Sequence, residues 1–287
     1  MLFYLKSLDT VIFESMSKKG EYDLANITIG IATHKPYPVP HDDIYYPIHV
    51  GAALHPNVLS NVQGDDIGDN ISTLNPYFCE LTALYWLWKN DNSDYKGLVH
   101  YRRYFASRRF RKRYDHTCFN RIIQKPELER MLADVPVILP KKRHYIIETI
   151  YSHYAHTMYA EQLSVTKAVL KDMAPEYLNY WQTLMNKRSE HIYNMMIMDR
   201  AHFDAYCEWL FPILFEIINR LDPEQYDAFH ARYPGRLSEM LLNVWIMKNH
   251  IPTGELPTTF MERVNWWKKG TSFLKAKFLK KRYTTSF

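Results

Sequence analysis

Two continuous apolar runs constrain the fold of this chain most strongly. ITIGIAT (27–33) and GLVH (97–100) are short and rich in β-branched residues. Such runs, bounded by turn residues, are typical of strands buried on both faces of a sheet. Prolines in HKPYPVP (34–40) prevent a helix directly after the first run, and YFCELTALYWLWKN (77–90) has the spacing of an amphipathic helix. This order predicts an α/β fold with an at least partly parallel sheet, and ligands at the carboxyl ends of its strands.

The rest of the chain divides into further strands and a mainly helical stretch. We expect an amphipathic helix over residues 1–24 and strands at 44–54, 133–142 and 193–198. Apolar residues spaced by three and four predict helices at 153–173, 175–187, 200–222 and 236–249.

Composition excludes several classes of protein. Of the 287 residues, 47% are hydrophobic, which excludes disorder as the main state. The three cysteines lie far apart without a CxxC pair, which excludes a zinc ribbon and a disulfide scaffold. No run resembles a secretory signal or is long enough to span a bilayer. We therefore expect a cytoplasmic protein, or one peripheral on the inner face of the cell membrane. The many aromatic residues suit a carbohydrate or nucleotide cleft, and an ordinary core equally.

Cationic side chains follow both apolar runs. His100, Tyr101, Arg102 and Arg103 end the second run, and a basic stretch follows at 108–113. Guanidinium groups match phosphate oxygens in a bidentate fork, so a diphosphate is the natural partner. The segment that follows the first run would lie at the same edge if the strands are parallel. Its candidate ligand-binding residues are Thr33, His34 and Lys35. The alternative is a solvated sheet edge with salt-bridged arginines.

The segment GDDIGDN (64–70) is rich in turn residues. Its carboxylates are close enough in sequence to hold a divalent cation, but the spacing does not match an EF-hand loop. Aspartate and asparagine are also common turn and capping residues. We favour a structural or substrate-positioning role for Asp65, Asp66, Asp69 and Asn70.

Two glutamates are candidates for a cleft. Glu80 is expected in the first turn of its helix, where the helix dipole stabilises a carboxylate by roughly 0.3–1 kcal/mol. Glu239 is expected at the start of the helix 236–249, with Ser238 as a possible cap. The plain interpretation of both is helix stabilisation. The functional one is that Glu239 is a general base held on a rigid element.

The sequence argues against several other sites. HYAH (153–156) places two histidines at i and i+3, but the sequence shows no nearby carboxylate to complete a zinc ligand set. The sequence contains no GxGxxG, GxxxxGK[ST] or GxSxG motif. We therefore expect no metal and no cofactor, with a divalent metal not favoured.

Several blocks resemble a known bacterial family. IATHKPYPVP, YYPIHVGAAL, GDDIGDNISTLNPYFCELTALYWLWKN and GLVHYRRYF, followed by YNMMIMDRAHFDAYCEWLFPILFEI and LSEMLLNVWI, resemble in order a family first catalogued as a domain of unknown function. That family was later linked to glycosyltransferases of capsule, exopolysaccharide and O-antigen synthesis, and some members resemble galactofuranosyltransferases. The resemblance covers residues 27 to about 260.

The resemblance implies a GT-A-like domain over residues 1–262. A Rossmann-like nucleotide-binding half (25–142) would precede a mostly helical acceptor-side half (143–262). Many GT-A enzymes end one strand in Asp-x-Asp, which holds a metal on the donor diphosphate. The corresponding strand here ends in His100-Tyr101-Arg102. Fixed cations would then neutralise the leaving diphosphate in place of a metal ion.

The implied reaction is transfer of a hexose, expected to be galactofuranose or galactose, from a UDP-sugar to a hydroxyl of a growing glycan. It would be inverting, with Glu239 as the base, because inverting GT-A enzymes often place a carboxylate at a helix start late in the domain. A non-catalytic nucleotide- or carbohydrate-binding protein and a basic scaffold of a polysaccharide assembly complex are the alternatives.

The segment 263–287 is basic and amphipathic. Residues 264–287 contain seven lysines and arginines and no acid, interleaved with large apolar residues. This pattern is typical of an interfacial helix on an anionic membrane, and suits a glycan acceptor on a polyprenyl diphosphate. A disordered basic tail fits the pattern as well. Nucleic acid is the weaker interpretation, because no nucleic-acid motif accompanies the charge.

Overall fold

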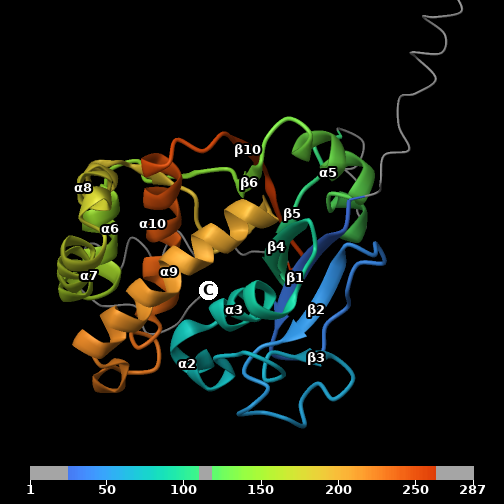
Figure 1. Ribbon diagram of the computed structural model, residues 1–287, viewed down its shortest axis with the longest axis horizontal. Coiled ribbons are helices and arrows are strands. Elements are labelled where there is room, and N and C mark those ends of the chain that lie inside the picture. The colour runs from blue at the N-terminus through green and yellow to red at the C-terminus, as the bar shows by residue number, and fades with distance from the viewer. Residues whose placement is uncertain (1–24, 110–117, 263–287) are drawn as a thin grey trace, which may run out of the picture.

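A central mixed sheet organises the protein, whose computed structural model describes residues 25–109 and 118–262 (Figure 1). The predicted helix at 1–24 and the basic segment 263–287 lie outside these residues. The strand order is β10(Thr253–Leu256), β6(Val137–Pro140), β9(Met196–Asp199), β4(Tyr95–His100), β1(Ile27–Thr33), β2(Tyr45–His49) and β3(Gln63–Gly64). β1 pairs in parallel with both β2 and β4, whereas β9 is antiparallel to its neighbours. The predicted α/β class is confirmed.

Two short strands and a separate ribbon complete the β structure. β5(Arg103–Phe105) pairs antiparallel with β4 and with β11(Thr258–Phe260). β7(Arg143–His144) and β8(Ser189–Glu190) form a two-stranded antiparallel ribbon. The sequence did not predict these elements, because strands of two or three residues carry too little periodicity to be recognised.

The helices divide into a layer on the sheet and a layer beyond it. They are α2(Asn75–Phe78), α3(Leu81–Asn90), α5(Lys125–Leu132), α6(Ile150–Thr157), α7(Ala160–Met173), α8(Leu178–Asn186), α9(Arg200–Arg220) and α10(Tyr233–Lys248). In Figure 1, α6, α7 and α8 lie on the side of the molecule away from the sheet, with α9 and α10 between. This arrangement gives the GT-A-like fold that the resemblance implies, an α/β sheet with a mostly helical second half.

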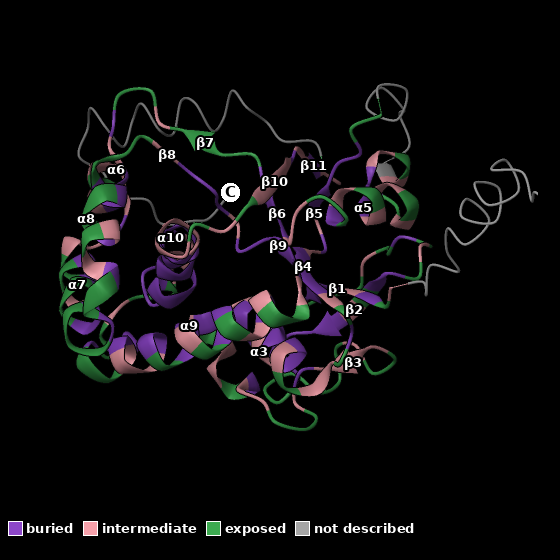
Figure 2. Ribbon diagram, turned by 45° about the horizontal axis from the view of Figure 1, so that its top comes forward, coloured by how far each residue is buried: buried purple, intermediate pink, exposed green. Residues whose placement is uncertain are grey.

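The sheet has a hydrophobic core on each face, as the buried segments in Figure 2 show. Successive side chains of a strand point to opposite faces. Met196 and Met198 of β9 thus join the large core with α3 and α9, while Ile197 joins the smaller core with α5. Strands buried on both faces explain why the apolar runs in the sequence are continuous.

Some predicted elements are shorter or interrupted. The strand expected at 44–54 ends at His49, because the chain turns at Gly51, whose φ of 72° favours glycine. The helix expected at 77–90 is broken at Cys79, which has a φ of 54°. The helix expected at 153–173 is also two helices, because Met158 is extended and a new capping box begins at Tyr159.

The two predicted halves share one sheet. β9, β10 and β11 belong to the segment 143–262, yet they pair with strands of 25–142.

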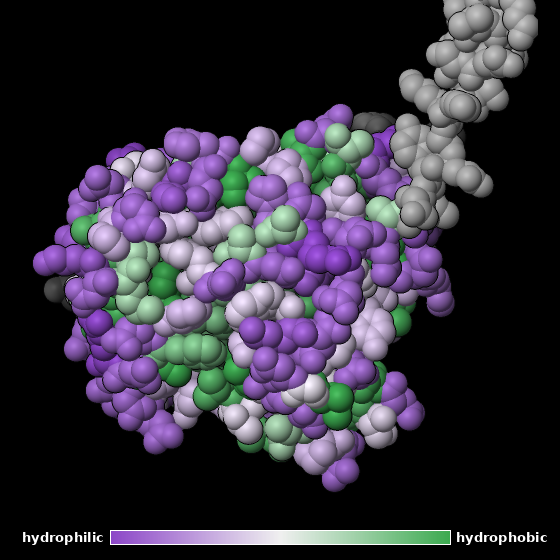
Figure 3. Space-filling model, viewed as in Figure 1, coloured by the Kyte–Doolittle hydropathy of each residue, from purple (hydrophilic) through white to green (hydrophobic). Residues whose placement is uncertain are grey.

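No helix within 25–109 and 118–262 is both long and apolar enough to cross a membrane. On the face shown in Figure 3, hydrophobic side chains gather in small groups between hydrophilic ones.

Candidate functional site

Parallel pairing brings the two predicted ligand-binding segments to one edge of the sheet. Ala32 is the register partner of His100, and the Tyr101 N–H donates to the Ala32 carbonyl at 3.2 Å. The segments that follow β1 and β4 therefore lie side by side. Thr33 is buried and its hydroxyl donates to the Lys35 carbonyl at 2.8 Å, so it shapes the turn after β1.

A cationic cluster surrounds the buried Tyr101 ring. The His34 ring stands edge-on to it at 5.2 Å, and Lys35 Nζ lies 5.2 Å from its centroid. The Arg102 guanidinium carbon is 5.3 Å from the same ring. Burial lowers the pKa of His34, and the positive charges of Lys35, Arg102 and Arg232 lower it further. His34 is therefore mainly neutral at pH 7 and can donate a hydrogen bond, while the three charged neighbours attract an anion.

Arg103 occupies a different part of the site. Its guanidinium carbon lies 3.8 Å from the Tyr193 ring centroid and 5.3 Å from that of Phe260. Burial lowers the pKa of Arg103, and the negative charges of Glu239 and Glu80 oppose this. Among the described residues its Nε has no hydrogen-bond partner. Arg103 therefore lies within electrostatic reach of the two carboxylates, whereas Arg102 lies beside the Tyr101 ring with its guanidinium 3.9 Å from Glu262.

A hydrogen-bonded network holds Glu80 in place. The Asn194 side-chain amide donates to Glu80 Oε1 and to the Gly235 carbonyl, both at 2.7 Å. The Ser238 hydroxyl lies 2.7 Å from Asn194 Oδ1. Ser238 is inside α10 and fully buried, so it is not the cap that the sequence suggested.

Burial raises the pKa of Glu239 to about 7, and the nearby Glu80 carboxylate contributes to this rise. The Tyr193 backbone amide and the charges of Arg236 and Arg103 act in the opposite direction. The position differs from the predicted one: α10 begins at Tyr233, so Glu239 lies in its second turn and not at its start. A carboxylate with a pKa near 7 is poised to exchange a proton at neutral pH.

Three strained residues surround the carboxylates. Cys79, Tyr193 and Asn194 have φ values of 54°, 84° and 50°. Left-handed φ is uncommon for residues other than glycine and costs roughly 1–3 kcal/mol each where it is strained. The Arg232 Nε–H donates to Cys79 Sγ at 2.8 Å, and His100 Nε2 lies 2.5 Å from the Tyr193 carbonyl. Strain concentrated here is typical of a functional site.

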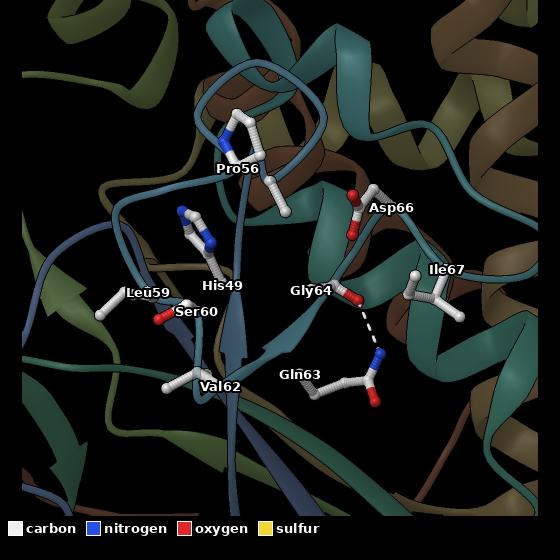
Figure 4. A pocket seen from close by; sticks show the side chains of 10 residues that line it. His49, Pro56, Leu59, Ser60, Val62, Gln63, Gly64, Asp66 and Ile67 are labelled. Carbon is white, nitrogen blue, oxygen red and sulfur yellow. Dashed lines mark hydrogen bonds between the residues drawn. The ribbon is translucent and has the colours of Figure 1, made fainter.

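A cavity of about 290 Å³ lies beside the carboxyl ends of β2 and β3 (Figure 4). His49, Gln63 and Asp66 are among its lining residues. Figure 4 shows the His49 and Asp66 side chains on the walls of this space, among apolar residues. His49 is buried, burial lowers its pKa, and among the described residues its Nε2 has no partner. His49 pairs with Thr33 in the sheet, so the cavity adjoins the cationic cluster.

The predicted acidic turn mainly holds its own loop. Asp65 is fully buried and accepts the amides of Gly51 and Ala52 at 2.9 and 3.1 Å. Asp69 accepts the Tyr85 hydroxyl at 3.1 Å. The Asn70 side chain donates to the carbonyls of residues 66 and 68. Of the four predicted positions, Asp66 is the one that lines the cavity.

A second buried carboxyl group lies near Glu239. Tyr145 donates to Glu190 Oε1 at 2.8 Å, while Glu190 Oε2 has no partner among the described residues. Burial, together with the nearby Glu239 charge, raises the pKa of Glu190 to about 8. The sequence did not indicate Glu190, nor did it indicate Asn194 or Arg232, because their positions depend on tertiary contacts with distant segments.

A carboxylate does lie close to the histidines of HYAH. Glu148 accepts hydrogen bonds from His153 Nδ1 and His156 Nδ1, both at 2.9 Å. Each of the two Glu148 carboxylate oxygens is hydrogen-bonded to one of the imidazole rings. In the part of the chain that the structure describes, no group of three His, Cys, Asp or Glu residues could hold a metal ion. Arg111, Lys112 and Arg113 of the predicted basic stretch lie outside that part.

The chain is similar to a protein family and to a solved structure. The profile of the family described as "Domain of unknown function (DUF4422)" matches residues 28–250. The apo structure of the WbbM bifunctional glycosyltransferase is similar, with 30% sequence identity and a TM-score of 0.76 over 83% of this chain. The match covers 46% of the WbbM chain, so this protein spans about half its length. No curated protein sequence gives a significant match.

Proposed function

Because the chain belongs to the DUF4422 family, we propose that it is a glycosyltransferase of polysaccharide synthesis that uses a UDP-sugar. One observation carries the proposal. Cations that follow β1 and β4 lie at the same sheet edge as Glu239, whose pKa is raised to about 7. An anion-binding cluster beside a base is what sugar transfer from a nucleotide diphosphate requires. The likeness to a structure described as a bifunctional glycosyltransferase supports the same reaction class.

The donor diphosphate is proposed to bind at the cationic cluster. Lys35, Arg102 and Arg232 supply positive charge, and the neutral His34 supplies a hydrogen bond. The cavity next to His49 would receive the uridine, because it adjoins the cluster and offers polar groups on an apolar wall. We propose that these fixed cations stabilise the leaving diphosphate without a metal ion.

Glu239 is proposed to be the general base of an inverting reaction. Its carboxylate takes the proton of the acceptor hydroxyl as the hydroxyl oxygen bonds to the anomeric carbon. The bond from that carbon to the diphosphate breaks on the opposite face, and the electron pair leaves with the diphosphate. Glu80 raises the pKa of Glu239 and thereby the basicity of its carboxylate. His100, Tyr101 and Arg103 would fix the geometry of this edge.

The acceptor is proposed to enter near Glu190 and Tyr145. Their hydrogen-bonded pair lies close enough to Glu239 for its charge to raise the pKa of Glu190. The unpartnered Glu190 Oε2 would bond a sugar hydroxyl, and the Tyr145 ring would pack against a sugar face. We propose a polyprenyl-linked glycan as acceptor and galactofuranose or galactose as the transferred hexose, at the inner face of the cell membrane.

Two measurements test the function. UDP should raise the melting temperature of the protein, and UDP-galactofuranose, UDP-galactose and UDP-glucose should be screened for turnover with a synthetic glycan acceptor. Glu239→Gln should lower kcat about 10²–10⁴-fold with UDP binding unchanged. Near-full turnover in this variant excludes Glu239 as the base. UDP stabilisation without turnover of any donor would indicate a binding protein instead. If EDTA abolishes turnover, the reaction needs a divalent metal ion. That result would contradict the proposal that protein cations stabilise the leaving diphosphate without a metal ion.

A further inference from the structure

The loop between β7 and α6 presents apolar side chains to solvent. Ile146 is 89% exposed and the next residue, Ile147, is 68% exposed. Tyr151 in the first turn of α6 is 46% exposed. Single exposed apolar residues are ordinary, but two adjacent isoleucines held this far out of the core indicate a contact surface. In Figure 2 this loop is the exposed arch between β7 and α6.

Basic residues surround these isoleucines. The exposed cations of the two neighbouring segments are Lys141, Lys142, Arg143, Lys187 and Arg188. Backbone hydrogen bonds join the segments: the Tyr145 N–H donates to the Arg188 carbonyl at 2.7 Å, and the Ile150 N–H donates to the Lys187 carbonyl at 2.9 Å. The cations therefore lie around the base of the apolar arch.

The acidic side chains of these segments are buried. Glu148 is the one acid between residues 141 and 151, and it is buried with its carboxylate between two histidines. Glu190, across the ribbon from Arg143, is buried as well, and burial raises its pKa to about 8. Within residues 141–151 and 187–190 the exposed charged side chains are therefore all basic, although the partly exposed Glu255 lies nearby, beside His191.

We propose that residues 141–151, together with Lys187 and Arg188, form a surface that docks on an anionic lipid bilayer. The isoleucines would enter the interface between head groups and acyl chains, while the cations contact lipid phosphates. A protein partner would also cover isoleucines, but the five exposed cations of 141–143 and 187–188, with no exposed acid in those segments, are complementary to a negatively charged head-group layer.

The docking surface is continuous with the proposed acceptor entrance. The Tyr145 hydroxyl bonds Glu190 inside the site, and the next residue, Ile146, is the most exposed of the apolar residues. Membrane contact here would place the Glu190 side of the site at the bilayer, where the sugar of a lipid-linked acceptor lies. This consequence rests on the proposed function, whereas the docking itself does not.

The test compares full-length variants on vesicles of phosphatidylcholine with and without phosphatidylglycerol. Ile146→Ser/Ile147→Ser and Lys141→Glu/Lys142→Glu should each lower partitioning onto the anionic vesicles at least about tenfold. Matched controls are Met173→Ser and Lys167→Glu/Lys171→Glu, which alter exposed residues of α7 and should bind like the unchanged protein. High salt should weaken binding of the unchanged protein.

A local measurement separates this loop from the basic segment 264–287. Hydrogen exchange of the peptide covering 141–151 should slow when anionic vesicles are added. Vesicle binding without protection of this peptide, or unchanged binding of the isoleucine variant, overturns the proposal. The proposal is also overturned if the isoleucine variant binds vesicles normally but forms smaller oligomers than the unchanged protein. That result would mean that the isoleucines contact a second copy of the chain.

The proposed function is read out separately in the same variants. UDP stabilisation and turnover with a soluble acceptor should equal those of the unchanged protein, because the substituted side chains lie outside the site. Loss of docking with normal UDP stabilisation supports the membrane surface. Normal docking without any UDP stabilisation leaves the surface intact and refutes the UDP-dependent function.

Discussion

The side-chain amide of Asn194 donates a 2.7 Å hydrogen bond to the Glu80 carboxylate, and so joins residues 114 positions apart in the chain. The bond ties the segment before β9 to the segment before α3. It keeps a negative charge beside Glu239, and that charge contributes to the raised pKa of Glu239. The left-handed backbone of Asn194, a conformation that asparagine readily adopts, is therefore part of the arrangement that sets the proton affinity of the proposed base.

Glu80→Gln should move the pH dependence of turnover. Glutamine still accepts the Asn194 hydrogen bond but carries no charge, so the pKa of Glu239 should fall below its value of about 7. The acid limb of kcat/KM should then shift to lower pH. Glu176→Gln, an exposed glutamate before α8, is the matched control and should leave the profile in place. An unchanged limb in Glu80→Gln would show that Glu80 does not act on the titrating group.

Arg102→Ala should weaken donor binding. Loss of a charge-assisted bond to phosphate costs about 1.5–3 kcal/mol, which corresponds to roughly 10- to 150-fold in Kd for UDP. Calorimetry with UDP measures this directly. Arg130→Ala on α5, an exposed arginine, should bind UDP like the unchanged protein. Equal Kd values for both variants would place the diphosphate away from the cationic cluster.

The sequence predicted the sheet edge well because it depends on local signals. The apolar runs, the prolines after β1 and the parallel order together place His34 near Tyr101. The helix break at Cys79 was not predicted, because its sequence continues the amphipathic spacing and the left-handed φ is imposed by contacts such as that with Arg232.

The residue at which α10 begins explains why the predicted position of Glu239 was wrong. Ser238 directly precedes Glu239 and could cap a helix that begins there, yet α10 begins earlier, at Tyr233. Pro234 and Gly235 lie within its first turn, where proline is favourable but glycine is an unusual choice. Tertiary packing thus overrides the local signal. The same applies to Glu190, whose burial arises from a ribbon of only two residues per strand.

Glu190 should contribute a fall in the free energy of unfolding of the unliganded protein as pH rises. Its folded pKa of about 8 exceeds the usual 4.5, so between these values the folded state holds a proton that the unfolded state releases. The free energy of unfolding therefore decreases with pH in this window, by up to about 1.4 kcal/mol per pH unit for one group. Glu190→Gln cannot release the proton and should flatten the slope between pH 5 and about 8. Urea unfolding over this range measures it, and parallel slopes would contradict the assignment.

Gly97→Ala should destabilise the sheet. A Cβ on Gly97, in the middle of β4, would lie 2.8 Å from the Met196 carbonyl oxygen and 2.9 Å from Ile197 Cγ1. Because the nearer atom belongs to the backbone of β9, it cannot move without disturbing the pairing of the two strands, and overpacking of this kind costs about 1–3 kcal/mol.

The matched control for this substitution is Gly235→Ala, which introduces the same methyl group into α10. Its Cβ would meet no atom closer than the Phe78 carbonyl oxygen at 3.6 Å, and alanine is the better helix former by about 1 kcal/mol. Gly235→Ala should therefore raise the urea midpoint, whereas Gly97→Ala should lower it, with the slope of each transition unchanged. A Gly97→Ala protein as stable as the original would mean that β4 and β9 can separate to admit a side chain, and that the sheet under the proposed site is less rigid than its pairing indicates.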